Sequence, residues 1–253
     1  MEEYRLKLKG EIIEDYKIEE MIWHGGTSNI YKGVSLNSNF HKIVAIKVLH
    51  PHRNFSHQIK SFEKEFKILK KLSHPNILKV YKFGKIDKLY YIIMEYIDGM
   101  SLKIMLNEKA EVSPNTLLKI LIKVGETIEY IHSKKIVHND IKPENILISK
   151  NFLDLKLIDF GYAEKLSFFR KRVNYTGGTE KYIAPERKNG IIDFKSDIYS
   201  YGVMLEEILS GYDLIEEIYP VILSAKSENP EKRPHLKDII KKLKAIYENW
   251  NNQ

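Results

Sequence analysis

The order in which strand-like and helix-like segments follow one another is the feature that most constrains the fold of this chain. Segments with alternating or β-branched apolar residues, which are typical of strands, are concentrated in the first 97 residues. These predicted strands are residues 16–23, 29–36, 42–49, 77–84 and 89–97. Between the third and the fourth, residues 61–74 carry apolar side chains at helical spacing. The sequence therefore predicts a five-stranded sheet accompanied by one helix.

The rest of the chain is predicted to be mainly helical. Ser113 and Pro114 form an N-cap and first-turn pair that starts a long amphipathic helix. Further helices are predicted at residues 196–211 and 233–250, with short apolar strands at 145–149 and 155–159. Strands that precede helices in this way, instead of alternating with them, indicate the α+β class.

The boundary between the two parts is predicted at the stretch 95–101, where the composition changes and Asp98-Gly99 marks a turn. We therefore expect a small, strand-rich N-terminal lobe at residues 1–95 and a larger helical lobe at residues 96–253.

Composition excludes several classes of protein. The 253 residues are 43% hydrophobic, which is ordinary for a globular chain, and contain no cysteine, so disulfides and cysteine-bound zinc are excluded. No apolar run approaches the roughly 18 residues that span a bilayer, and we expect a soluble cytoplasmic protein with no nucleic-acid partner. The net charge of +7 suits an anionic ligand such as a nucleotide, although a solvated lysine-rich surface gives the same balance.

Five polar residues stand out against their apolar surroundings. Lys47 lies within the apolar run VAIKVL, where an unpaired ammonium would cost several kcal/mol, and Glu65 on the following helix can supply its carboxylate partner. Asp140 and Asn145 lie in the loop HNDIKPEN between a helix and a strand, and Asp159 follows a strand in LIDFG. Each of the three loop residues, taken alone, is an ordinary turn former.

Taken together, the order and spacing of these residues resemble the eukaryotic-like (Hanks-type) serine/threonine protein kinases, from about Tyr16 to Tyr247. The loop GGTSNIYKG is most similar to that of bacterial members. The resemblance implies a two-lobed kinase fold and transfer of the ATP γ-phosphate to serine or threonine of a protein, including the chain itself. ATP, Mg²⁺ and a protein substrate are the implied cofactors and partner.

The resemblance also implies roles for catalytic residues. Lys47 would hold the α- and β-phosphates, with its ammonium fixed by Glu65. Asp140 would orient the substrate hydroxyl and accept its proton, and Lys142 would approach the γ-phosphate. Thr179, in GGTEKYIAPE, matches the threonine that supports these two residues in serine/threonine kinases.

The binding residues implied by the resemblance divide into metal ligands and nucleotide contacts. Asn145 and Asp159 would hold Mg²⁺ through hard oxygen atoms. Met94 would guard the back of the adenine pocket, and backbone groups of Glu95 and Ile97 would bond the adenine edge. The full set expected to contact the nucleotide is Gly25, Gly26, Ser28, Ile30, Ala45, Lys47, Met94, Glu95, Ile97 and Leu147.

Three further matches are structural. Glu186, in the motif APE, would form an ion pair with Arg233, which anchors the segment that receives the substrate. Asp197 would hold the catalytic loop from a buried helix. Each of these residues, taken alone, could equally be an ordinary helix cap.

The chain departs from the family pattern at three places. Trp23 replaces the first glycine of the glycine-rich loop, and its indole either packs on the small lobe or covers the nucleotide or narrows its entrance. Asn139 replaces the arginine that precedes the catalytic aspartate in most regulated members, which predicts weak dependence on phosphorylation of the activation loop. The segment 211–230 is short, which predicts a shortened or missing helix and places the usual protein docking surface in doubt.

Two functions compete with that of an active protein kinase. A nucleotide-binding pseudokinase scaffold is supported only by Trp23 and Asn139, and a small-molecule kinase on the same fold only by the short segment. The sequence leaves open the substrate, the oligomeric state and which of Ser167, Tyr175 and Thr176 accepts a phosphate, if any does.

Overall fold

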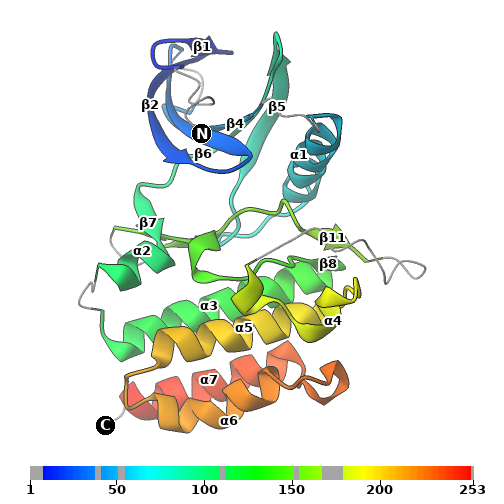
Figure 1. The fold of residues 1–253 in the computed structure, drawn as a ribbon. Helices are drawn as coiled ribbons and strands as arrows, with labels where there is room; N and C mark the ends of the chain where they lie inside the picture. The colour runs from blue at the N-terminus through cyan, green and yellow to red at the C-terminus, as the bar shows by residue number, and fades with distance from the viewer. Residues whose placement is uncertain are drawn as a thin grey trace. The chain divides into compact units, whose positions relative to one another are not determined.

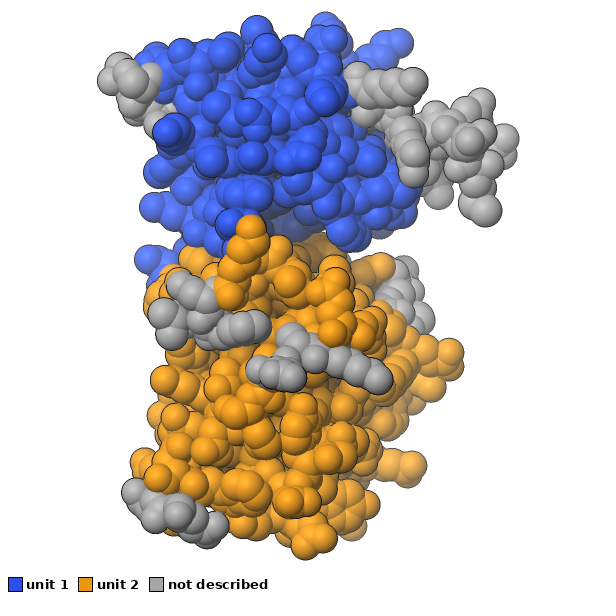
Figure 2. Space-filling model, turned by 90° about the vertical axis from the view of Figure 1, so that its left-hand side faces the viewer, with its two compact units in different colours: residues 1–73, 78–98 blue, residues 74–77, 99–253 orange. Residues whose placement is uncertain are grey.

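The computed structural model describes residues 8–37, 41–50, 55–108, 112–150, 154–166 and 179–251. The chain divides into two compact units, coloured separately in Figure 2. The first unit comprises residues 1–73 and 78–98, and the second comprises residues 74–77 and 99–253.

The first unit is built on an antiparallel sheet of six strands (Figure 1). In spatial order these are β1 (Ile12–Ile13), β2 (Tyr16–His24), β3 (Ser28–Ser35), β4 (Ile43–Leu49), β6 (Leu89–Glu95) and β5 (Val80–Ile86). Strands β2 to β6 are the five predicted ones. The sixth, β1, is two residues long and pairs with the start of β2, so it is too short to show a periodic apolar pattern.

Apolar side chains of alternate strand positions form the core on one face of this sheet. On β4, Val44, Ile46 and Val48 point into this core, while Ala45 and Lys47 point to the opposite face. The other core members are Ile13, Tyr16, Ile18, Tyr31, Tyr91 and Ile93. Alternation along β4 thus separates a packed face from a face that carries the predicted nucleotide contacts.

The helix of the first unit, α1 (Phe55–Leu69), differs from its predicted bounds at both ends. It begins six positions earlier than the predicted 61–74 and ends five positions earlier. At its C-terminal end, Lys71 and Leu72 donate to the carbonyls three residues back, so the chain tightens into turns ahead of Pro75. Phe62, Ile68 and Leu69 are its buried apolar side chains, and Glu65 is buried beside them.

The second unit is helical. Its helices are α2 (Leu102–Asn107), α3 (Pro114–Ser133), α4 (Pro185–Lys188), α5 (Phe194–Leu209), α6 (Ile215–Ala225) and α7 (Leu236–Asn251). Helix α3 packs on α5 and α7, and the three run side by side in Figure 1. The predicted cap of α3 is formed, because the Ser113 hydroxyl accepts from the Thr116 N–H at 3.2 Å and Pro114 fills the first turn. In the part of the chain that the structure describes, no helix is both long and apolar enough to cross a bilayer.

Short strands and 3₁₀ turns of the second unit surround its polar loop. Strands β10 (Leu155–Leu157), β9 (Ile146–Ser149) and β7 (Gly99–Ser101) form one small sheet, and β11 (Glu164–Lys165) pairs with β8 (Ile136–Val137). The 3₁₀ turns are η1 (Pro143–Asn145), η2 (Glu180–Tyr182) and η3 (Pro230–Lys232). Because β8 and β9 flank the loop, they fix both of its ends.

The segment 211–230, predicted to have a shortened or missing helix, contains the helix α6. This helix has 11 residues with Pro220 inside it, and acidic side chains occupy its first turn, where they complement the helix dipole.

Candidate active site

The lysine in the middle of the apolar strand β4 has the partner that its burial requires. Lys47 Nζ lies 2.7 and 2.8 Å from the two carboxylate oxygens of Glu65 on α1, and both side chains are largely buried. The ammonium also lies 5.8 Å from the centre of the Phe62 ring. The predicted ion pair is therefore formed, and it holds the ammonium in one position over the sheet.

Strand register places four of the ten predicted nucleotide contacts on one face of the sheet. Ile30 pairs with Lys47, and Ala45 pairs with Met94 in the neighbouring row. Directly paired residues of antiparallel strands project to the same face, so these four side chains share the face opposite the core. Glu95 ends β6, and its N–H already donates to the Lys79 carbonyl at 2.9 Å.

The predicted glycine-rich loop is the turn between β2 and β3. The Gly25 N–H donates to the Ser28 carbonyl at 3.0 Å and closes the turn. Ser28, which stands where the family has its third glycine, is buried, whereas Gly26 is exposed. A side chain at Gly26 would meet nothing, but a Cβ at Gly25 would collide with the indole ring of Trp23.

In the second unit, the loop between β8 and β9 carries three of the predicted residues, and Thr179, the residue before η2, contacts one of them. The Asn145 amide nitrogen donates to the carbonyl and to the carboxylate of Asp140, each at 2.8 Å. Lys142 Nζ lies 2.8 Å from Asp140 Oδ2 and donates to Thr179 Oγ1 at 2.8 Å. Asp140 is buried, and its carboxylate therefore has a fixed direction set by an amide and an ammonium.

A buried carboxylate of α5 holds the start of this loop. The oxygens of Asp197 accept the N–H groups of His138 and Asn139 at 2.8 Å each and contact His132 Nε2 at 2.9 Å. Burial opposes ionisation of Asp197, but the contact with His132 and the interactions with His138, including its N–H, outweigh it and lower the pKa of Asp197. With this carboxylate in place, Asn139 adopts the left-handed backbone conformation, at φ 67°.

His138 is held in its neutral form. Its Nδ1 accepts from the Asp140 N–H at 3.3 Å, so its Nε2 carries the proton and donates to the Ile158 carbonyl, with 3.2 Å between Nε2 and the oxygen. Complete burial lowers the pKa of the ring, and the nearby carboxylates Asp197, Asp140 and Asp159 only partly offset that effect.

The predicted metal ligands are connected through the backbone. The Ile158 N–H donates to the Asn145 carbonyl at 2.9 Å, which ties the residue before Asp159 to the polar loop. Asp159 has a left-handed backbone at φ 59°, an uncommon conformation for a residue other than glycine. The Asn145 amide nitrogen donates to Asp140, which leaves the amide oxygen of Asn145 as the atom suited to bind a hard cation. The carboxylate of Asp159 is equally suited to such an ion.

No cluster of three or more histidine, cysteine or acidic residues suited to a metal occurs within the described ranges. Asn145 and Asp159 would supply two oxygen ligands, and water and substrate phosphate usually supply the rest where Mg²⁺ binds with a nucleotide.

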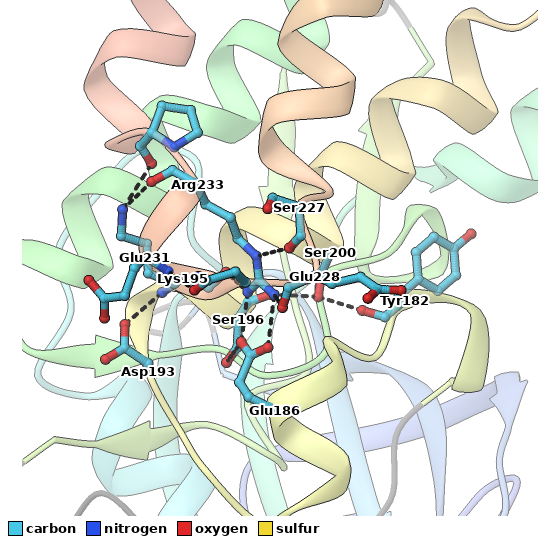
Figure 3. A network of polar contacts seen from close by, with 12 residues as sticks. Tyr182, Glu186, Asp193, Lys195, Ser196, Ser200, Ser227, Glu228, Glu231 and Arg233 are labelled. Carbon is cyan, nitrogen blue, oxygen red and sulfur yellow. Dashed lines mark hydrogen bonds and ion pairs between the residues drawn. The ribbon is translucent and has the colours of Figure 1, made fainter.

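The ion pair predicted between Glu186 and Arg233 is the centre of a larger network (Figure 3). Two Arg233 nitrogens donate to the two Glu186 oxygens at 2.7 and 2.8 Å, in the parallel arrangement that guanidinium and carboxylate groups favour. The remaining donor capacity goes to the carbonyls of Lys195, Ser227 and Glu228. This network joins α4, α5 and η3, and so fixes the C-terminal end of the segment that follows Asp159.

Sequence reasoning missed a second anchor of that segment. Glu207 on α5 accepts from Lys103 Nζ at 2.6 Å and from the Tyr182 hydroxyl, and Lys181 Nζ lies 2.7 Å away. Burial opposes ionisation of Glu207, but the three donors outweigh it and lower its pKa to about 2. A glutamate in the last turn of a helix gives no sequence signal for such a role.

Not all predicted residues can be placed together. Leu147 lies on β9, paired with Ser101, in the second unit, whereas the other predicted nucleotide contacts belong to the first. Ser167, Tyr175 and Thr176, the candidate phosphate acceptors, lie outside the described residues.

Comparison with known proteins agrees with this geometry. Residues 16–250 match the family model described as "Protein kinase domain". The chain is 34% identical over 243 residues to the serine/threonine-protein kinase PrkC of Bacillus subtilis, covering 91% of this chain and 37% of PrkC. It is 35% identical over 206 residues to the probable serine/threonine-protein kinase PknB of Lactococcus lactis, covering 80% of this chain and 32% of that protein. PknB of Mycolicibacterium smegmatis is 31% identical over 256 residues, covering 86% of this chain and 40% of PknB.

The chain thus spans about a third of the length of the curated relatives it matches. The kinase family as a whole uses ATP and a divalent metal ion. With its two-part fold, its buried lysine–glutamate pair and the arrangement around Asp140, this chain belongs to the protein kinase domain family and has relatives among bacterial serine/threonine kinases.

Proposed function

We propose that the chain transfers the γ-phosphate of ATP to serine or threonine hydroxyls of a protein, including its own. The observation that carries this proposal is the set of contacts among Asp140, Lys142 and Asn145 of the loop between β8 and β9, together with the contact from Lys142 to Thr179, which precedes η2. In this proposal residues 1–95 are the nucleotide-binding lobe and residues 96–253 are the catalytic lobe. The cytoplasmic location expected from the sequence stays a prediction.

Asp140 is the proposed general base. Asn145 and Lys142 both contact its Oδ2, so Oδ1 is the oxygen proposed to receive the hydroxyl hydrogen. The Lys142 ammonium contacts both Asp140 and Thr179, so a positive charge lies beside the proton acceptor. There it can stabilise the negative charge that develops on the phosphoryl group during transfer. The threonine hydroxyl holds that ammonium in place, and it supports the assignment to serine and threonine substrates.

The phosphates of ATP are assigned to Lys47, whose ammonium is fixed by Glu65. Asn145 and Asp159 would hold Mg²⁺ through an amide oxygen and a carboxylate, and the ion would neutralise charge on the phosphate oxygens when bound. Ile30, Ala45 and Met94 would form the apolar wall for adenine, since they share the face of Lys47.

The neutral residue before the base supports activity that depends little on phosphorylation of the activation loop. The Asn139 amide donates to the Tyr162 carbonyl at 3.0 Å. This uncharged hydrogen bond connects the catalytic loop, between β8 and β9, to the start of the activation segment, which runs from Asp159 to Glu186. An arginine at this position would need a counter-charge to neutralise it when buried. Asn139 has no such requirement.

The test is label transfer from γ-labelled ATP with Mg²⁺, followed by acid hydrolysis of the labelled protein. The wild-type chain is compared with Asp140→Asn and with Lys47→Met, and an exposed aspartate on α7, Asp238→Asn, serves as the matched control. Phosphoserine or phosphothreonine should form in the wild type and in the control. Loss of the base should lower the rate by about 10²–10⁴-fold.

Equal labelling of wild type and Asp140→Asn would point to a contaminating kinase and refute the proposal. Binding of ATP without any transfer would indicate a nucleotide-binding scaffold. Transfer to small molecules but to no protein would indicate a small-molecule kinase.

A further inference from the structure

A β-bulge determines which face of the sheet the side chain of Trp23 occupies. In the pairing of β2 with β3, Met21 lies opposite Tyr31 and Trp23 lies opposite Ile30, so two positions on β2 correspond to one on β3. Ile22 is the extra residue. Without it, position 23 would fall opposite Asn29 and project to the core face, because a one-residue slip reverses the side-chain direction.

With the bulge, Trp23 belongs to the row of Lys47. Trp23 pairs with Ile30, Ile30 pairs with Lys47 and Lys47 pairs with Ile92, so a continuous cross-strand row connects the indole to the ammonium. The neighbouring row contains Ala45, which is paired with Met94 and Lys32. If Ala45 and Met94 face adenine and Lys47 faces phosphate, Trp23 is aligned with the phosphate end of the nucleotide.

The indole is neither a core side chain nor one directed away from the loop. Trp23 is 52% exposed, on a face where Ala45 and Met94 are buried. Its six-membered ring lies against the α-carbon of Gly25, because a Cβ built there would collide with ring atoms Cη2 and Cζ3. The ring therefore rests on the turn of the glycine-rich loop and keeps half of its surface available.

We propose that Trp23 forms a wall of the nucleotide site that covers the sugar and phosphate part of ATP. This inference rests on the proposed function for the position of ATP. Where the family has a glycine, which leaves space, this chain has an indole whose exposed surface a bound nucleotide would cover. Gly25 is then required for two reasons, since its lack of a side chain lets the backbone approach phosphate and also makes room for the ring.

Intrinsic fluorescence tests the contact directly, because the chain has two tryptophans and Trp250 lies on α7 in the second unit. The variant Trp250→Phe leaves Trp23 as the single reporter, and Trp23→Phe is the matched control that retains Trp250. Titration with ATP and Mg²⁺, and separately with ADP and adenosine, is compared with calorimetric binding of the same compounds. We expect saturable changes with ATP and ADP at the calorimetric Kd, a weaker response to adenosine, and no response in the control.

Kinetics test the energetic part of the inference. Covering roughly 50 Å² of apolar surface corresponds to about a tenfold change in affinity. Trp23→Gly should therefore raise KM for ATP about tenfold while kcat and KM for the protein substrate change less than about twofold. A side chain that only packs on the sheet would instead change the melting temperature of the free protein and leave KM for ATP unaltered.

The outcomes separate this inference from the proposed function. Calorimetric binding of ATP without a fluorescence change, or an unchanged or lower KM in Trp23→Gly, would overturn the role of Trp23 and leave the kinase proposal intact. A fluorescence response in a wild-type chain that transfers no label would support the wall and refute catalysis. Absence of any ATP binding would overturn both.

Discussion

Replacing Arg233 by methionine tests how strongly the C-terminal end of the activation segment is anchored. The guanidinium is fully buried, and it donates to both oxygens of Glu186 and to three backbone carbonyls. It also lies 5.0 Å from the centre of the Tyr199 ring. Methionine keeps much of the volume of the side chain and removes every one of these donors.

The expected cost is large because the substitution leaves a buried carboxylate without its cation. Glu186 would retain the Ser196 hydroxyl at 2.8 Å as a donor but lose the pair that lowers its pKa despite its burial. Breaking a buried pair in this way typically costs about 3–5 kcal/mol. For a chain of this length that corresponds to a fall in melting temperature of roughly 10 °C.

The measurement is the melting temperature and the urea midpoint of wild type and Arg233→Met, with Lys67→Met as the control. Lys67 pairs with Glu63 at 2.7 Å on the surface of α1, and a pair so exposed is worth about 0–1 kcal/mol. The double variant Arg233→Met with Glu186→Gln should recover part of the loss, because no unpaired charge remains. If the free energy of unfolding of Arg233→Met falls by less than about 1 kcal/mol, or if the double variant is no more stable than Arg233→Met, this reasoning is refuted.

Two further predictions concern Glu207 and Asn139. Because the folded pKa of Glu207 is lowered to about 2 from its ordinary 4.5, its ionised form stabilises the fold at higher pH, and that contribution is lost as the pH falls from 4.5 towards 2. Above pH 5 the free energy of unfolding of the wild type, measured by urea denaturation, should exceed that of Glu207→Gln by roughly 2 kcal/mol. A difference that does not become smaller as the pH falls from 4.5 towards 2 would contradict this prediction. For Asn139, phosphatase-treated and autophosphorylated protein should transfer phosphate at rates within about tenfold of each other, and a gap above roughly a hundredfold would exclude the proposed independence.

The features best predicted from the sequence are those that follow from the periodic spacing of apolar residues or from the cost of burying an unpaired charged side chain. The alternation of apolar residues located all five long strands of the first unit, and the isolated lysine in β4 called for a carboxylate that Glu65 supplies. The cap at Ser113 also followed from local chemistry alone. In each case the determining interaction lies within a few residues or is imposed by the cost of leaving a charge unpaired.

The features that the sequence did not predict depend on distant partners or on backbone geometry. The three donors to Glu207 come from α2 and η2, so no local pattern identifies them. The hydrogen bond from Asn139 to the Tyr162 carbonyl depends on the left-handed backbone of Asn139. Asparagine tolerates that conformation, but its presence in the sequence does not show that the backbone adopts it. The bulge at Ile22 could not be predicted from the sequence either, because the pattern of side chains in MIWH is compatible with both possible strand registers.

The position of Asp197 has a consequence for how the protein loses activity. Loops commonly open by local unfolding at a free energy well below that of the whole domain. Here the amides of His138 and Asn139 are bonded to a carboxylate on α5, a helix whose apolar side chains are almost all buried. The catalytic loop should therefore stay closed until that helix itself comes apart, so that activity and the helical core disappear in the same transition.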